Sequence, residues 1–170
     1  VVTDNVPEIA PLARSGLVAG FKVFLGTTVG NIPAPDDGML LEALAEVAHT
    51  GMRIGFHAEN DAIVKHGIRR LQELGRTDAL AHLESRPPIA EVEAIDRVCL
   101  FARHTGAAVH IFHLSSSEGL AAIEAWRTRG VDVTTETGPQ YCFLAADRAA
   151  AAGNVIRANP PIREAGHGDV

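Results

Sequence analysis

Residues 107–135 read AAVHIFHLSSSEGLAAIEAWRTRGVDVTT, and this stretch decides the fold. Residues 107–114 form an apolar, β-branched run that is typical of a buried strand. The serines that follow can cap a helix over 118–129, which Gly130 ends. Residues 131–135 then form a further β-branched run. A strand, a helix and a strand in succession predict two parallel strands joined by a crossover helix.

The same alternation extends toward both ends of the chain. The predicted strands are 17–25, 52–57, 107–114 and 131–135, and the predicted helices are 38–49, 60–74, 89–104, 118–129 and 145–152. An extended segment over 154–163, broken by a double proline, follows the last helix. The strands are nearly continuous apolar runs, as expected for strands that are covered on both faces.

Two architectures fit this pattern: an open doubly wound sheet and part of a βα-barrel. An open sheet of the nucleotide-binding type needs a glycine-rich loop after an early strand, and neither G-x-G-x-x-G nor G-x-x-x-x-G-K-[ST] occurs. A complete (βα)8 TIM barrel needs roughly 250 residues. The chain has 170 residues, so we expect a single partial barrel domain over 1–170.

Composition excludes several classes of partner. Fifteen lysines and arginines against 21 aspartates and glutamates give a net charge of −6, which argues against nucleic acid and anionic membranes as partners. No apolar run approaches the ~20 residues that span a bilayer, and the chain starts without the features of a signal peptide. Two cysteines cannot form a disulfide framework, so we expect a reducing, cytoplasmic location.

Three residues on successive predicted strands could bind metal. His57 ends the second strand and His113 ends the third, where parallel βα proteins place their sites. Lys22 lies inside the first strand, where burial would lower its pKa and make it nucleophilic. Carbon dioxide could convert such a lysine into a carbamate that bridges two divalent ions, and neutral imidazoles suit zinc.

Each of these residues also has a structural interpretation. A histidine at a strand end can simply be hydrogen-bonded, and a lysine in a strand can lie at a sheet edge. His110 and His113 are three positions apart, so on a strand they point to opposite faces, and we expect His113 to be the one that faces the barrel interior. Glu59 could support His57 or could be a helix N-terminal charge.

Five motifs, taken together, resemble a known family. They are GFKVF at 20–24, HAEN at 57–60, SRPP at 85–88, HLSS at 113–116 and NPPIR at 159–163. In this order and spacing they resemble the cyclic amidohydrolases, which include dihydroorotase, allantoinase and dihydropyrimidinase (hydantoinase). The resemblance covers nearly the whole chain. It implies a (βα)8 TIM barrel with a binuclear zinc centre that hydrolyses, or in reverse closes, the C–N bond of a cyclic amide.

The resemblance also implies roles for individual residues. Lys22 matches the carbamylated lysine that bridges the metals, His57 and His113 match ligands of the second metal, and Asn159 matches a position beside the substrate ring. The family's first-strand His-x-His pair and its last-strand proton-shuttling Asp are absent, so no catalytic acid or base is identified. The chain would then hold the fourth to seventh strands, roughly the central four βα units, and would be incomplete as an enzyme by itself.

The choice of family member depends on a few positions. Asn159 before the double proline favours dihydroorotase, acting on dihydroorotate or N-carbamoyl-aspartate in pyrimidine synthesis. Thr27 lies where dihydropyrimidinases carry a tyrosine, which disfavours a hydantoinase. HAEN at 57–60 instead slightly favours allantoinase over dihydroorotase. We expect a dihydroorotase that forms a homo-oligomer. The alternatives are an allantoinase or hydantoinase, a non-catalytic relative that binds no zinc, and an unrelated α/β binding domain.

Overall fold

Four parallel strands form the centre of the computed structural model, which describes residues 1, 4–26 and 32–168. The strands are β1 (Phe21–Phe24), β2 (Arg53–His57), β3 (Ala108–Ile111) and β4 (Val133–Thr135). They pair in the order β1-β2-β3-β4, so each described strand lies beside its neighbour in sequence. A doubly wound sheet reverses its strand order at a switch point, whereas a βα-barrel does not, so the observed order favours the barrel.

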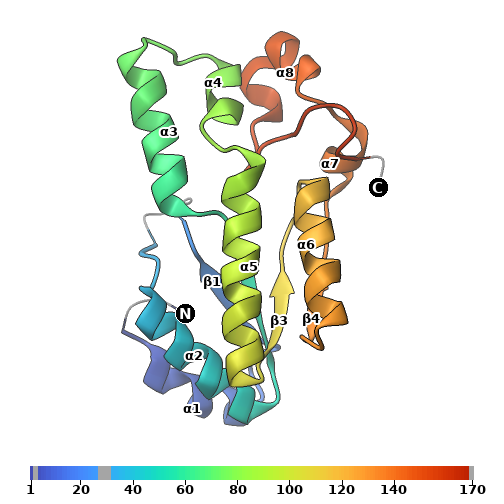
Figure 1. Cartoon of the computed structure of the whole chain (residues 1–170). Coiled ribbons are helices and arrows are strands. Elements are labelled where there is room, and N and C mark those ends of the chain that lie inside the picture. Colours follow the sequence, from blue (N-terminus) through green and yellow to red (C-terminus); the bar gives the residue numbers. More distant parts are fainter. Residues whose placement is uncertain (2–3, 27–31, 169–170) are drawn as a thin grey trace.

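Helices connect the strands and cover one face of the sheet. The α-helices are α1 (Ile9–Ser15), α2 (Asp37–Thr50), α3 (Asp61–Glu73), α4 (Ala79–Glu84), α5 (Pro88–Thr105), α6 (Ser117–Thr128), α7 (Pro139–Phe143) and α8 (Asp147–Ala152), and the 3-10 helices are η1 (Val6–Glu8) and η2 (Gly153–Ile156). Figure 1 shows α2, α5 and α6 side by side on the same face of the sheet. None of the described helices combines the length and the apolar content needed to cross a bilayer.

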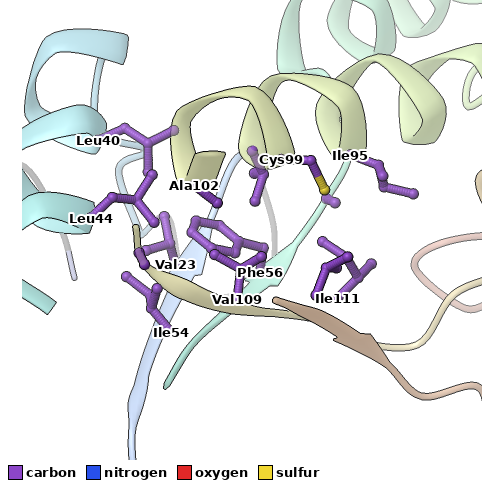
Figure 2. Close-up of a cluster of buried hydrophobic side chains, with 14 of the residues drawn as sticks. Val23, Leu40, Leu44, Ile54, Phe56, Ile95, Cys99, Ala102, Val109 and Ile111 are labelled. Atoms are coloured by element: carbon purple, nitrogen blue, oxygen red, sulfur yellow. The ribbon is translucent and has the colours of Figure 1, made fainter. Parts of the chain in front are cut away.

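The hydrophobic core lies between the sheet and this helical layer. Val23, Phe56 and Ile111 are buried in it, and Figure 2 shows them beneath α5. Strand side chains alternate between faces, so the residues next to these three along each strand point away from the helices. Lys22 and His110 are two of them, both in register with Gly55 of β2. The face that would line a barrel interior therefore carries polar residues.

The predicted strands and long helices are confirmed, with small shifts at their ends. The first strand is shorter than predicted because β1 begins only at Phe21. A left-handed Gly16 ends α1, and Gly20 lies so close to β2 that a Cβ atom there would come within 2.8 Å of the Arg53 carbonyl oxygen. No sequence pattern predicts α1, α4 and α7, because elements of five to seven residues carry too little periodicity to be recognised.

Candidate metal centre

Two histidines meet where β2 and β3 end. His57 is the last residue of β2, and His113 lies two residues beyond the end of β3. The His57 Nδ1 atom is 3.0 Å from the His113 Nε2 atom, and the ring centroids are 4.6 Å apart in an edge-to-face arrangement. The structure therefore brings together two of the three residues predicted as metal ligands.

The prediction that at most one of His110 and His113 faces the interior was wrong. It assumed that the strand continues to His113, but β3 ends at Ile111 and His113 has a left-handed backbone with φ of 43°. The alternation of faces therefore does not extend to His113. His110 is in register with Lys22 through β2 and bonds to the Thr134 hydroxyl at 2.8 Å, while His113 reaches His57 on the same side of the sheet.

A buried carboxylate bonds to the His57 ring nitrogen that does not face His113. The His57 Nε2 atom lies 2.8 Å from the Glu59 carboxylate, which also accepts a hydrogen bond of 2.5 Å from Arg86. Burial would raise the pKa of Glu59, but the His57 bond and the nearby arginine charges outweigh it and hold that pKa below its usual value. A charged Glu59 keeps a proton on Nε2, so the Nδ1 lone pair of His57 faces His113.

Glu59 therefore supports His57 through its bond to the ring. The first turn of α3 is capped instead by Asn60, whose side chain accepts a hydrogen bond from the Ile63 backbone N–H. Of the two interpretations that the sequence left open, the structure selects support of the histidine.

His113 stays neutral, the form that binds metals. Burial, together with the charges of His57 and Lys22, lowers the pKa of His113 to about 4. Its Nδ1 atom is buried and has no hydrogen-bond partner among the described residues. Two nitrogen ligands at ~2.05 Å from a tetrahedral zinc lie about 3.3 Å apart, so the observed 3.0 Å separation of Nδ1 and Nε2 fits a shared ion with little movement.

Lys22 differs from the sequence expectation because its side chain is exposed in the described chain, not buried. The ammonium nitrogen lies 4.1 Å from the centroid of the Phe112 ring and 5.0 Å from that of Phe24. The same two rings contact the histidine pair, with centroids 5.7 Å apart for Phe24 and His57 and 6.3 Å apart for Phe112 and His113. Lys22 thus shares its aromatic neighbours with both histidines.

A glycine makes room for this aromatic contact. A Cβ atom on Gly55 would lie only 2.1 Å from the Phe112 ring. Phe112 therefore packs directly on the β2 backbone, between Lys22 and His110.

No group of three or more histidine, cysteine, aspartate or glutamate side chains in the described part of the chain is placed to hold a metal ion. The two histidines and Lys22 would thus form part of a centre only.

Asn159 lies on the extended segment after η2, in a stretch that neighbouring residues anchor. The Tyr141 hydroxyl donates a 2.8 Å hydrogen bond to the Pro160 carbonyl, and the His82 ring bonds to the Ala158 carbonyl at 2.9 Å. The Asn159 side-chain oxygen is buried without a hydrogen-bond partner among the described residues, so it can still accept a bond from a ligand. Thr27, used above to disfavour a hydantoinase, lies outside the described residues.

Curated relatives match nearly the whole chain. An allantoinase from Solibacter usitatus (strain Ellin6076) is 42% identical over 165 residues, which cover 96% of this chain and 36% of the relative. An L-hydantoinase from Paenarthrobacter aurescens is 34% identical over 165 residues, again covering 96% of this chain and 36% of the relative. The chain thus spans little more than a third of the length of these relatives. No family model matches it.

Solved structures match the fold closely. The L-hydantoinase (dihydropyrimidinase) from Arthrobacter aurescens superposes with a TM-score of 0.94 at 32% identity, covering 99% of this chain and 37% of that one. A D-hydantoinase gives 0.88 at 27% identity, covering 99% of this chain and 37% of that one. The predicted fold class is confirmed: the chain is α/β with a parallel sheet and covers part of a TIM-barrel amidohydrolase.

These similarities support the cyclic amidohydrolase family for this chain. Within that family the relatives reported above are an allantoinase and hydantoinases. They support the alternative from the sequence analysis, and they do not support dihydroorotase as the most similar member.

Proposed function

We propose that the protein hydrolyses the ring amide of allantoin or a hydantoin, and that this chain supplies Lys22, His57 and His113 to a centre of two zinc ions. The observation that carries the proposal is the convergence of the His57 and His113 nitrogens at 3.0 Å, with Glu59 bonded behind His57. The similarity to an allantoinase and to hydantoinases supports the substrate class.

Each proposed residue has a distinct task. His57 would bind through Nδ1, because Glu59 keeps the proton on Nε2, and His113 would bind through Nε2. Lys22 would bridge the ions as a carbamate, and the unpartnered Asn159 oxygen would accept a hydrogen bond from a ring N–H. When bound, the ions would polarise the ring carbonyl and lower the pKa of water. The proton shuttle is expected outside residues 1–170.

A substrate panel tests the activity. The full-length, zinc-supplemented protein that contains residues 1–170 is assayed for ring opening of allantoin, hydantoin, dihydrouracil and dihydroorotate. Opening of allantoin or hydantoin supports the proposal, whereas opening of dihydroorotate alone restores the dihydroorotase interpretation. A protein that opens none of these rings, binds no zinc and carries an unmodified Lys22 would instead support the non-catalytic relative.

Ligand variants test the site. His113→Asn should lower kcat by about 100-fold or more and reduce the zinc content, because it removes one of the converging nitrogens. The matched control is His49→Asn, since His49 is an exposed residue in the last turn of α2. Intact mass before and after acid treatment reports the carbamate on Lys22, as the loss of one carbon dioxide. Equal activities for the two histidine variants would contradict the assignment.

A further inference from the structure

Four ionisable side chains are buried near the histidine pair. Glu59 and Glu91 are each 1% exposed, and Arg86 and Arg163 are each 6% exposed. Burying a charge costs several kcal/mol unless partners compensate. The proposed chemistry uses Glu59 and, through it, Arg86. It leaves Arg163 without a role.

The Arg163 guanidinium binds three different parts of the chain. Its Nε atom donates a 2.9 Å hydrogen bond to the Ser115 hydroxyl, and Nη1 donates to the Arg86 carbonyl. The Nη2 atom lies 3.9 Å from the Glu91 carboxylate on α5. One side chain thus connects the segment after β3, the segment before α5 and the α5 helix itself.

Two of these contacts each reach a proposed metal ligand through one further residue. Ser115 follows His113 by two residues, and its backbone N–H and hydroxyl both donate to Glu91, at 3.0 and 2.9 Å. Arg86 donates to Glu59, which in turn holds the His57 ring. Arg163 is therefore linked to one histidine through Ser115 and to the other through Arg86.

We propose that Arg163 is a positioning residue that fixes His57 and His113 relative to each other, an inference that rests on the metal centre proposed above. Arg163 follows Asn159 by four residues, so it also ties the proposed substrate-contacting segment to both histidines. The planar guanidinium donates in several fixed directions at once, which a lysine ammonium on a flexible stem does not. A site of this kind tolerates shifts of only about 0.5 Å in its supporting residues.

The first test uses metal-free protein and reads the tautomer of the His57 ring by two-bond ¹H–¹⁵N NMR. We expect the wild type to show one Nε2–H tautomer, held by Glu59, and Arg163→Met to show a mixture of tautomers. The matched control is Arg97→Met, because Arg97 is a part-buried arginine of α5 whose ion pairs are with Asp37, at 2.5 Å, and with Glu93. Arg97→Met should keep the wild-type His57 signal even if its melting temperature falls.

The second readout is the rate at which bound zinc transfers to a chelator. Arg163→Met should release zinc about tenfold faster, as is typical of residues that orient a ligand, and Arg97→Met should release it at the wild-type rate. If Arg163→Met does not fold, Arg163→Lys takes its place, since it keeps the charge but loses the planar guanidinium that donates in several fixed directions. An unchanged His57 tautomer in whichever Arg163 variant folds would overturn the proposal.

The outcomes separate this inference from the proposed function. A changed His57 tautomer in a protein that opens none of the cyclic amides would support the role of Arg163 and reject the activity. Ring opening by a protein whose His57 signal is the same in wild type and Arg163 variants would support the activity and reject the role of Arg163.

Discussion

Glu59 and Asp132 are both acidic residues paired with an arginine, but their surroundings differ completely. Glu59 is 1% exposed and bonds to Arg86 at 2.5 Å, whereas Asp132 is 63% exposed and bonds at 2.8 Å to Arg53, which is 36% exposed. Removing one partner of a buried pair leaves an uncompensated charge, which costs about 3 kcal/mol or more. Exposed pairs contribute ~0–1 kcal/mol.

We therefore expect Glu59→Gln to lower the free energy of unfolding by about 3 kcal/mol and Asp132→Asn to change it by less than about 1 kcal/mol. Urea unfolding followed by circular dichroism measures both. Similar small changes in the two variants would show that Arg86 finds another partner or solvent once the Glu59 charge is removed.

The two cysteines should differ sharply in reactivity. Cys99 is a residue of α5 whose side chain is buried in the core, and burial together with the nearby Asp96 charge raises the pKa of its thiol to about 12. Cys142 is exposed on α7. Since the thiolate is the reactive form, a disulfide reagent at mildly alkaline pH should modify Cys142 alone in the native protein and both cysteines in denaturant. Modification of both thiols before unfolding would mean that the α5 region opens readily.

At the scale of elements, Gly67 decides how closely α3 approaches the segment before α5. A Cβ atom at Gly67 would lie 2.7 Å from the Ser85 carbonyl oxygen and 2.9 Å from the Ser85 Cα, both backbone atoms that cannot easily move. Alanine would gain up to about 1 kcal/mol in helix propensity, but overpacking against backbone costs ~1–3 kcal/mol.

Gly67→Ala should therefore destabilise the protein by about 1 kcal/mol net. Gly38→Ala is the matched control, because Gly38 also lies in a helix and its Cβ would meet only the Asp36 side chain, at 3.3 Å. Thermal unfolding should show a lower midpoint for the first variant and an equal or higher midpoint for the second. Stabilisation by Gly67→Ala would mean that α3 can move away from Ser85.

A structural feature could be predicted from the sequence where neighbouring residues determine it, and not where residues far apart in the chain do. The strands and long helices follow from local apolar patterns, and His57 and Lys22 were placed correctly on β2 and β1. The position of His113 depends on one left-handed residue after β3, which no periodicity reveals. The contact of Arg163 with Arg86 joins positions 77 residues apart, and only the fold brings them together.

The choice of family member shows the same limit. Asn159 was given more weight than the HAEN motif at 57–60, yet the relatives favour allantoinase and hydantoinase. In the structure, the histidine of HAEN converges on His113, its glutamate bonds to that histidine, and its asparagine caps α3. Asn159, in contrast, makes no side-chain hydrogen bond through Oδ1 among the described residues.

At the scale of the whole molecule, the helical layer covers only one face of the sheet (Figure 1). The other face carries Lys22 and Phe112, and β4 ends the described sheet without a further described strand beside it. The β1 side is partly covered, because the amino group of Val1 donates a 2.5 Å hydrogen bond to the Lys22 carbonyl. An unpaired strand edge beside an uncovered face favours association with another chain.

We therefore expect residues 1–170, produced as an isolated chain, to self-associate through this face and the β4 edge. Size-exclusion chromatography with light scattering should give a mass that rises with concentration above the 18.0 kDa of one chain. The association should persist at high salt, because strand pairing is screened far less than surface charges. A mass that stays at that of one chain at every concentration would contradict this expectation and would mean that the open face and the β4 edge are covered within the same chain.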